Sequence, residues 1–463
     1  MSEYTPKSPL EYKLEKVTIT HGRNEHEFDI TASVVEIEVF ENLNRAYLTG
    51  SLVFYDDARI VEAVDFNGTE TITIIAGLYQ TDYKIKKEFA VREISSIHPA
   101  SDTSDVVTLK LIDKDSYISS MINVNKMYEG KPSEIIEHVL LDNFGATKRL
   151  YKQGSSSASD VGSDLPEIVA AASSSSAEMQ NTMRYLVPNM TPLEVIEKMK
   201  MRASGLQGAP YFCYSSLNDN DLRFFDLYTL LTEPSMNAEN PFLYSTVYAQ
   251  QNPGAGDTVS LNIMSFDMKN NENALALIMN GDVGAQYEYL DTTTALEHSF
   301  AYDVGKVFKH VLPAGANPVF DIMTQFNNKS ANEYRTKRVS RIATTSTFEP
   351  GMSNIYEEGT TSRHFSKAIS ISLRNMLGKS SVEIHVAGRQ FFPQGDHRTI
   401  GQIVSILTMA NQQPKGSNEE VEIDQKRSGD YLIYGCNHIF GKTEYSVKLS
   451  LVKITNYKGN TKL

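Results

Sequence analysis

Hydrophobic and polar residues alternate along the first part of the chain in a series of short segments. The alternation has a period of two in "HEFDITASVVEIEVF", "AYLTGSLVFYD", "ETITIIAGLY" and "DVVTLKLID", and turn signals such as Asn67-Gly68 and His98-Pro99 separate these segments. Side chains in a strand point alternately to the two faces of a sheet, so the pattern predicts strands. Strands this closely spaced, without helices between them, predict a small antiparallel barrel or sandwich over residues 1–115.

The pattern changes to helical spacing after these strands. The stretch "KPSEIIEHVLLDNFG" predicts a helix that is capped by Ser133 and closed by Gly145. The stretch "MTPLEVIEKMKMRASG" predicts a second helix, with Thr191 as N-cap, Pro192 at the first helical position and Gly205 at its end.

Both helices belong to a predicted helical insert over residues 116–205. Within it, residues 154–176 are rich in Ser, Ala and Asp and lack the apolar residues that offset ordering entropy, which predicts a mobile tract. The next stretch, "PYFCYSSLNDNDLRFFDLYTLL", indicates a hairpin that turns at residues 218–221. Residues 233–375 show little periodicity, and strand patterns return near the C-terminus. The chain is therefore predicted to be mainly β, of the α+β class, with two β modules separated by insertions.

The composition is that of a globular chain with an acidic balance. Hydrophobic residues make up 41% and charged residues 22% of the 463 residues. The formal net charge is −13, from 44 basic and 57 acidic residues. Proteins that grip phosphates depend on Lys and Arg, so sustained DNA binding is disfavoured, whereas a passage through which DNA slides without sticking suits an acidic protein.

Two cysteines, Cys213 and Cys436, do not make a disulfide framework, so we expect synthesis in a reducing cytosol. The N-terminal sequence has no apolar stretch of the secretory kind. No apolar run approaches the roughly 18 residues that predict a membrane span.

Candidate catalytic and metal-binding residues are few and poorly spaced. Asp56 and Asp57 are neighbours in a strand, so their carboxylates point to opposite faces, and a turn role is favoured over acid–base chemistry. Cys436 and His438 lie two apart on one strand face, as a nucleophile and its base would, but a strand-buried thiol is much more common. Other histidines match no metal-binding spacing and are expected to be surface or packing residues: His21, His26, His385 and His397.

The chain also lacks a nucleophile elbow, a Walker loop and a dinucleotide-binding fingerprint. We therefore predict a protein that is not an enzyme and has no catalytic, cofactor or metal site.

Several stretches occur in a distinctive order. In the first module "GSLVFYDD" is followed by "VEAVDFNGTETITI", and near the C-terminus "SVEIHVAGRQFFPQGDHRTIGQIVSI" is followed by "DQKRSGDYLIYGCNHIFGKTEYSVKLSLVKI". Together they resemble the tail-hub proteins of contractile-tailed phages, and the hub half of type VI secretion spike proteins is a related class. The positions that carry this resemblance are taken as architectural: Gly50, Asp56, Gly68, Glu70, Gly388, Pro393, Gly395, Asp396, Gly429, Tyr431 and His438.

The resemblance implies two similar antiparallel β-barrel domains of the tube type, with α/β insertion domains. The first barrel is expected at 1–115 and the second at 206–232 plus 376–455, with an outer domain at 233–375 inserted into it and a tail at 456–463. Three copies with two barrels each would form a pseudo-sixfold ring. Such a homotrimer would join a sixfold tail tube to a threefold central spike and continue the DNA channel.

The expected partners follow from this arrangement. They are two further copies of the chain, a spike protein below and the tail tube or tube-initiator protein above, with baseplate wedge and tape-measure proteins as further candidates and DNA only in transit. The expected location is the tail baseplate of a virion, assembled in the host cytoplasm. Two alternatives stay open: a cell-wall or polysaccharide hydrolase with β carbohydrate-binding modules, and the hub of a non-phage contractile injection system.

The glycines among these positions are expected where strands bend or turn. Gly50 and Gly68 fit a bent or tightly turned barrel strand. Residues 393–396 fit a turn between two curved strands, in which Gly395 is free to take a positive φ. The stretch "ENLNRAYLTGSLVFYDD" is thus expected to form a bent strand pair at a barrel corner, ended by its two aspartates.

Overall fold

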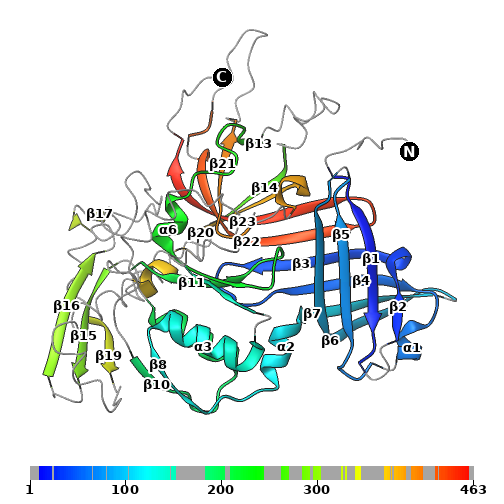
Figure 1. Ribbon diagram of the computed structural model, residues 1–463. Coiled ribbons are helices and arrows are strands. Elements are labelled where there is room, and N and C mark those ends of the chain that lie inside the picture. Colours follow the sequence, from blue (N-terminus) through cyan, green and yellow to red (C-terminus); the bar gives the residue numbers. More distant parts are fainter. Residues whose placement is uncertain are drawn as a thin grey trace, which may run out of the picture.

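The computed structural model describes most of the β structure of the chain (Figure 1). The described residues are 10–152 without 23–25, 65, 80, 103, 146 and 147; 183–203; 209–244; 262–270; 284–291; 296–303; 325–326; 329–330; 339–345; 370–377 without 376; 380–392; 398–409; and 423–457 without 426. At 183, 269–270, 380–381 and in the segments between 284 and 345, only the backbone is described. The predictions for the tract at 154–176, for Gly205 and for most of the tail therefore lie outside the described residues.

A largely antiparallel sheet of 13 strands dominates the described part of the chain. From the N-terminal region come β1 (Lys13–Thr20), β2 (Glu27–Asp29), β3 (Val34–Asn42), β4 (Thr49–Asp56), β5 (Thr71–Gly77), β6 (Lys84–Ser101) and β7 (Ser104–Asp113). From later regions come β13 (Phe242–Tyr244), β14 (Ile263–Asn270), β20 (Ser380–Ala387), β21 (Ile403–Thr408), β22 (Gly429–Gly441) and β23 (Tyr445–Asn456). The chain is thus mainly β, as predicted.

These strands form where the sequence alternates, and alternate residues build the main hydrophobic core. In β4, Leu52 and Phe54 are fully buried, whereas Tyr55 is 45% exposed. In β23, Leu449 and Leu451 are likewise fully buried. Burying such a side chain contributes about 1.5–3 kcal/mol relative to leaving it exposed, so the alternation decides which face of each strand turns to the core.

The two halves of the sheet have the same strand order. The spatial order is β3-β4-β7-β6-β5-β1 in the N-terminal half and β14-β20-β23-β22-β21-β13 in the C-terminal half, so strands matched in chain order occupy matching places. A short helix follows the third matched strand of each half, as α1 (Ile60–Val64) after β4 and as η4 (Gly388–Phe391) after β20. The two halves differ in one strand pairing: β1 is antiparallel to β5, whereas the matching strand β13 is parallel to β21. The halves are two versions of one topology.

Strand β22 joins the two halves. Its first part pairs with β21, and its second part pairs antiparallel with β3, from Gly435 opposite Asn42 to Gly441 opposite Glu36. The halves therefore share one continuous hydrogen-bonded ladder.

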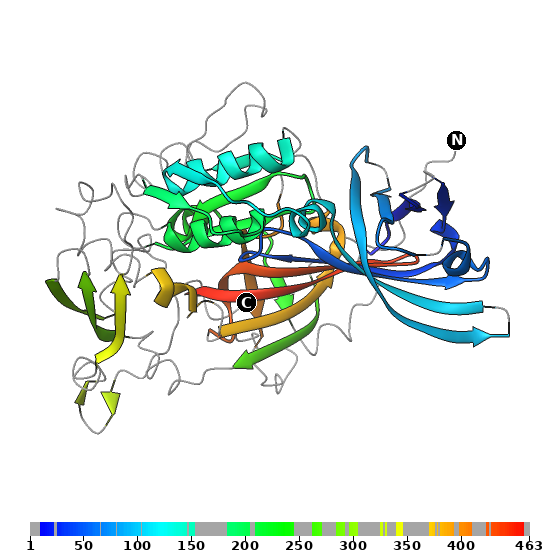
Figure 2. The same ribbon diagram turned by 90° about the horizontal axis from the view of Figure 1, so that it is seen from below.

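Neither half closes into a fully hydrogen-bonded barrel in the described residues. In the C-terminal half, only the single bridge between Leu243 and Asn262 links the β13 and β14 ends. The chain ahead of β1 reaches the β22–β23 turn through one bridge, between Glu11 and Glu444. The predicted pair of closed barrels is thus not confirmed, and the sheet is open and strongly curved where β1 to β7 lie (Figure 2).

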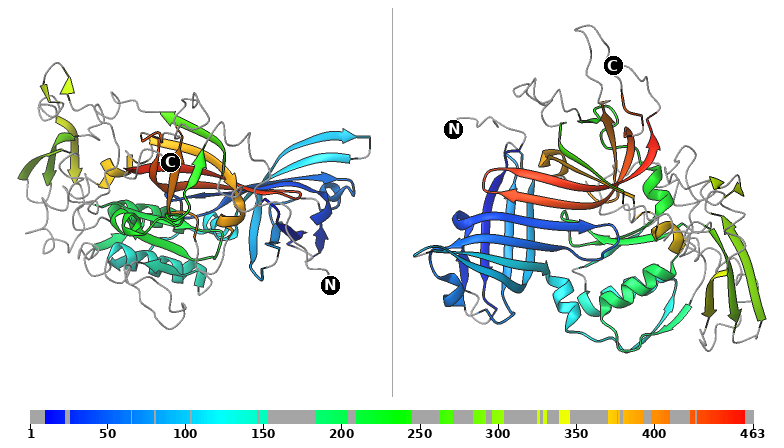
Figure 3. Two further views of the ribbon diagram at one scale, coloured as in Figure 1. Left: turned by 90° about the horizontal axis from the view of Figure 1, so that it is seen from above. Right: turned by 180° about the vertical axis from the view of Figure 1, so that it is seen from behind.

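A helical layer lies beside the β3–β22 joint (Figure 3). It consists of α2 (Lys114–Ser120), β8 (Met127–Gly130), α3 (Pro132–Phe144), β9 (Leu150–Lys152), β10 (Met183–Leu186), α5 (Pro192–Arg202), β11 (Tyr211–Ser215) and β12 (Leu222–Asp226). Helix α6 (Leu227–Thr232) follows β12 and contributes its buried leucines to the core of the large sheet. Strand β9 extends the β11–β12 pair, and β8 pairs with β10. The predicted hairpin is present, but it lies in this three-stranded sheet and not in the large sheet.

The two predicted helices begin differently. Thr191 caps α5 through a capping box with Glu194, as predicted. Helix α3 instead has Lys131 as N-cap, and the backbone N–H of Lys131 donates to Glu134 at 2.9 Å, so the prediction of Ser133 as cap was wrong. The reason is the proline after Lys131, which takes the first helical position. Gly145 ends the helix, as predicted.

The β11–β12 hairpin separates two hydrophobic cores. Phe212 and Tyr214 face the core of the large sheet, and Tyr211 and Cys213 face the core of α3 and α5. Period-two alternation in a strand buried on both faces produces this division.

Within the predicted outer domain at 233–375, β15 (Gly284–Asp291), β16 (Leu296–Asp303) and β19 (Val339–Thr345) form a separate sheet, and β17 (Gln325–Phe326) pairs with β18 (Lys329–Ser330). No helix in the described ranges is both long enough and apolar enough to cross a membrane.

Candidate functional site

Four buried side chains meet where β22 passes from one half of the sheet to the other. Cys436 and His438 share a face of β22 because they lie two residues apart. Glu41 of β3 is the direct cross-strand partner of Cys436, and Tyr445 comes from β23. We call Glu41, Cys436, His438 and Tyr445 the junction cluster.

His438 lies at the centre of the junction cluster and is fully buried. Its Nε2 is 3.2 Å from Cys436 Sγ and 3.5 Å from Glu41 Oε2. Its Nδ1 is 2.8 Å from Tyr445 Oη. The three remaining members thus each present one polar atom to the imidazole ring.

Glu41 also ties the joint to the helical layer. Its Oε1 accepts the backbone N–H of Leu217 and lies 3.4 Å from Ser216 Oγ, just beyond β11. Its Oε2 has no hydrogen-bond partner among the described residues, although Glu41 is only 2% exposed. A buried carboxylate oxygen without a donor is energetically costly, and this is the one carboxylate oxygen among the buried side-chain atoms that lack a hydrogen-bond partner in the described residues.

Aromatic rings close one side of the cluster. The Tyr445 ring stacks on Phe440 with centroids 4.5 Å apart and planes 7° apart. Gly388, the first residue of η4, lies against the same ring, since a Cβ there would stand 2.6 Å from Tyr445 Cγ and closer still to two other ring atoms. Only glycine fits at position 388, which gives this motif glycine a packing role.

Burial and charge in the junction cluster work against thiolate formation at Cys436. Burial, reinforced by the Glu41 carboxylate, raises the pKa of the Cys436 thiol well above its ordinary value. Burial also raises the pKa of Tyr445. A thiol held neutral is a poor nucleophile. The Cys436–His438 contact that the sequence suggested is formed, but the thiol is not activated.

Cys213, the other cysteine, lies on β11 and is buried in the core of α3 and α5. Burial raises its pKa to about 12. Both cysteines are free thiols.

Glu70 organises the turn before β5. Its carboxylate accepts the backbone N–H groups of Asn67 at 3.0 Å and Gly68 at 2.9 Å, and lies 3.2 Å from His21 Nδ1. Burial opposes ionisation, but these donors outweigh it, and the pKa of Glu70 is lowered. Gly68 has φ 89°, and its carbonyl accepts from Tyr117 Oη at 2.6 Å. Gly68 thus serves a tight turn, and His21 orders that turn.

Gly50 and Asp56 lie at opposite ends of β4. A Cβ on Gly50 would stand 2.6 Å from the backbone oxygen of Glu38, so the close approach of β3 requires glycine. The Asp56 carboxylate accepts the backbone N–H of Ile60 at 2.6 Å and of Val61 at 3.0 Å. Asp56 therefore ends the strand and begins α1.

Gly429 and Tyr431 lie at the start of β22. Gly429 has φ 141°, and a Cβ there would overlap the carbonyl oxygen of Thr455. The fully buried Tyr431 donates from Oη to the Arg427 carbonyl at 2.6 Å. The remaining motif positions, and one histidine considered above, lie outside the described residues: Pro393, Gly395, Asp396 and His397.

The last two histidines are set apart from the junction cluster. His26 is exposed, and its backbone carbonyl accepts from the His21 N–H at 3.2 Å. His385 lies on β20, where burial and then the charge of Lys448 lower its pKa.

Glu41 was missed in the sequence. The signal was present, because Glu41 continues the buried alternation of Ile37 and Val39 on β3, where an acidic side chain needs a partner.

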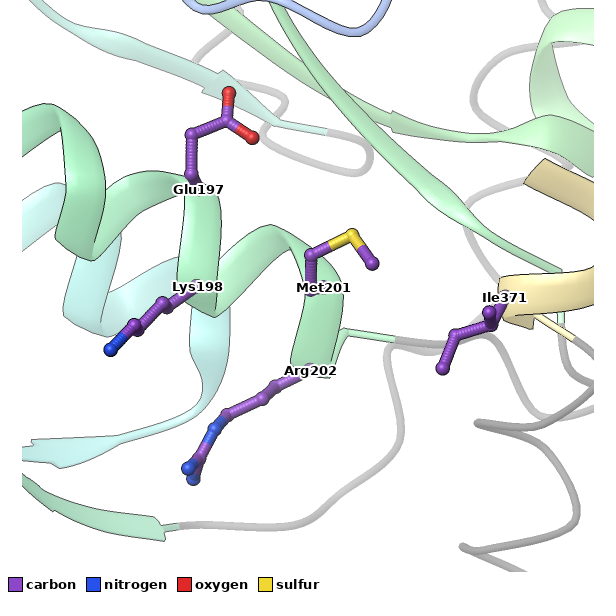
Figure 4. Close-up of a pocket in the computed structure, with 5 residues that line it drawn as sticks. All are labelled: Glu197, Lys198, Met201, Arg202 and Ile371. Carbon is purple, nitrogen blue, oxygen red and sulfur yellow. The ribbon is translucent and has the colours of Figure 1, made fainter. Parts of the chain in front are cut away.

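A pocket of about 310 Å³ lies beside α5, lined by Glu197, Lys198, Met201, Arg202 and Ile371 (Figure 4). The charged ends of Lys198 and Arg202 point away from Glu197, so the charges do not converge on a common point (Figure 4). The pocket lacks the convergent polar groups of a substrate site.

No protein-family model matches the chain, and no curated protein matches its sequence. Solved structures that are similar to it are phage tail proteins and proteins related to type VI secretion spikes. The tail protein of Neisseria meningitidis MC58 has a TM-score of 0.49 and 11% identity over 96% of this chain and 97% of that chain.

The 43 kDa tail protein of prophage MuSo2 from Shewanella oneidensis has a TM-score of 0.48 and 11% identity, over 95% of this chain and 98% of that chain. The E. coli c3393 protein is a type VI secretion component with structural similarity to T4 bacteriophage tail proteins gp27 and gp5. It has a TM-score of 0.38 and 8% identity, over 93% of this chain and 76% of that chain.

Proposed function

We propose that this chain is a non-enzymatic baseplate hub protein of a contractile phage tail, forming a homotrimeric ring between a sixfold tail tube and a threefold spike. The observation that carries the proposal is the shared strand order of the two halves of the large sheet. A chain with two equivalent units supplies six units in a trimer. One face of that ring can match sixfold neighbours and the other threefold neighbours.

The motif positions support the same assignment. They fall on both halves of the sheet, with Gly50 on β4 of one half and Gly388 after the matching strand β20 of the other. Each lies where backbone or ring atoms leave no space for a Cβ. These two glycines shape matching places in the two units.

The contact between the halves within one chain supports a particular contact between copies. There, the second part of β22 pairs with β3. By position in the repeated order, β6 matches β22 and β14 matches β3. The same contact between two chains pairs residues 92–100 of β6 in one copy with β14 of the next, in antiparallel orientation.

Both strands present an unpaired edge for this contact in the described part of the chain. Residues 92–100 pair with β7 alone, and β14 pairs with β20 alone within the sheet. Their exposed apolar side chains are Ile97 at 46%, Met264 at 47% and Met268 at 38%. Exposed apolar sheet edges favour pairing with another chain. The β6–β7 hairpin projects beyond the curved sheet, where a second copy can reach it (Figure 2).

The net charge of −13 suits a ring that DNA traverses. Acidic residues lower the affinity for phosphates, so the channel releases DNA instead of retaining it.

Mass photometry of the purified full chain tests the proposal. A trimer has a mass of about 155 kDa, three times the 51.7 kDa of one chain. The double variant Met264→Lys/Met268→Lys places two charges on the β14 edge and is expected to be monomeric with unchanged circular dichroism. The control Met121→Lys, at a residue 68% exposed beyond α2, should stay trimeric.

The two parts of the proposal fail separately in this experiment. A wild-type chain that is monomeric at all concentrations contradicts the hub. A double variant that stays trimeric contradicts the β6–β14 contact alone.

A further inference from the structure

The junction cluster contains an arrangement that the hub proposal does not use. One oxygen, one nitrogen and one sulfur atom, from Glu41, His438 and Cys436, all lie within 4.8 Å of one another and are all buried. They come from both halves of the sheet, because Glu41 lies on β3 and the others on β22. The Glu41 oxygen in this set is the one without a hydrogen-bond partner.

The distances between these atoms fit a common cation. His438 Nε2 is 3.2 Å from Cys436 Sγ and 3.5 Å from Glu41 Oε2. Ligands in a tetrahedral zinc site with bonds of about 2.0–2.3 Å lie roughly 3.3–3.8 Å apart. The two separations from His438 Nε2 lie in or next to this range, and the third, between Cys436 Sγ and Glu41, is at most 4.8 Å and would have to shorten on binding.

The other side of His438 is prepared for such a role. Its Nδ1 is 2.8 Å from Tyr445 Oη, which fixes the ring orientation and directs Nε2 to Glu41 and Cys436. A metal-bound histidine commonly has its second nitrogen held in this way. Tyr445 is itself fixed by stacking on Phe440 and by its contact with Gly388.

We propose that Glu41, Cys436 and His438 form a structural zinc site that fastens β3 to β22. Mixed oxygen, nitrogen and sulfur ligands suit Zn²⁺. Three protein ligands with a water as the fourth are the coordination of catalytic zinc sites, whereas most structural sites have four protein ligands, so this site would be a three-ligand structural site. On binding, the Cys436 S–H bond breaks, a zinc–sulfur bond forms and one proton is released to solvent. The thiolate and the Glu41 carboxylate together balance the two charges of the ion, and the orphaned oxygen of Glu41 gains a partner.

All three ligands of the proposed zinc site come from one chain, so zinc binding does not depend on trimer formation. The test therefore uses the full chain in any assembly state. The protein is unfolded in urea with a reductant and chelator, and refolded with or without Co²⁺ as the probe, since refolding gives the ion access to a buried site. The wild type should bind one Co²⁺ per chain and show a thiolate-to-cobalt charge-transfer band. Zinc should displace the cobalt, and protein purified without chelator should contain about one zinc per chain by elemental analysis.

The two free cysteines provide a matched pair of variants. Cys436→Ser should lose the charge-transfer band and at least tenfold in cobalt affinity, whereas Cys213→Ser should keep both, because Cys213 lies in the other core. Glu41→Gln, which keeps an acceptor for the Leu217 N–H, should weaken cobalt binding while folding normally. Tyr445→Phe should weaken it about tenfold through the loss of ring orientation.

The proposal is overturned if refolded wild type shows no thiolate–cobalt band, or if Cys436→Ser retains it. It is also overturned if Cys213→Ser and Cys436→Ser lose the band equally.

Discussion

The variant Gly388→Ala tests the packing of η4 against the junction cluster. The new Cβ would lie 2.6 Å from Tyr445 Cγ, against an ordinary carbon–carbon contact of about 3.5–4.0 Å. The Tyr445 ring would have to move by roughly 1 Å. This movement is opposed by two contacts: the Phe440 ring stacks on Tyr445 with centroids 4.5 Å apart, and His438 Nδ1 lies 2.8 Å from the Tyr445 hydroxyl.

Overpacking of this kind costs about 1–3 kcal/mol, so Gly388→Ala should lower the free energy of unfolding by that amount. The matched control is Gly435→Ala on β22, where the new Cβ would meet Ser450 Cβ at 3.3 Å. Its small contact cost is offset by the loss of unfolded-state entropy, which stabilises by about 0.4–1 kcal/mol, so its net effect should be close to zero.

Urea unfolding followed by circular dichroism measures both variants. Adding Tyr445→Ala to Gly388→Ala removes the ring and should cancel the glycine effect, giving a coupling energy of about 1 kcal/mol or more. Equal stability of Gly388→Ala and Gly435→Ala, or additive effects in the double variant, would refute the packing argument.

Three further predictions concern the N-terminal half. Glu70 has a lowered pKa in the folded chain, so its carboxylate stabilises the fold above the unfolded pKa of about 4.3, and this stabilisation is lost as pH falls through the folded pKa. Glu70→Gln should therefore lower the melting temperature at pH 7 more than at pH 3, and equal lowering at both would contradict this. Gly50→Val should reduce soluble trimer, because its side chain would collide with the Glu38 carbonyl oxygen, and normal trimer in sizing chromatography would remove this role. Asp56→Ala should lower the free energy of unfolding by about 0.5–2 kcal/mol through loss of the Ile60 cap, and a neutral effect in urea unfolding would contradict it.

Local features of the fold could be predicted where one short stretch contains all the relevant residues. Period-two alternation located β3, β4, β5 and β7 because each strand buries its own alternate residues. The cap at Thr191 was predicted because its partner Glu194 lies three residues away. Ser133 was mistaken for a cap because the proline before it was not weighed.

Long-range features could not be predicted in this way. The pairing of Glu41 with Cys436 joins strands from opposite ends of the chain, and alternation within each strand does not specify its partner. That the sheet stays open could not be predicted either, because closure into a barrel depends on which strand edges pair. The Cys436–His438 contact was visible as a spacing and the burial of the thiol was the favoured reading, but the strand that supplies Glu41 to the same site was not specified by either segment.

The central claim is most directly tested by electron cryomicroscopy of the wild-type chain viewed along its assembly axis. The account predicts a ring of three chains with six similar β units around an open centre, and with β6 of each chain beside β14 of the next. Particles with a single β unit per chain, or with a filled centre, would contradict it.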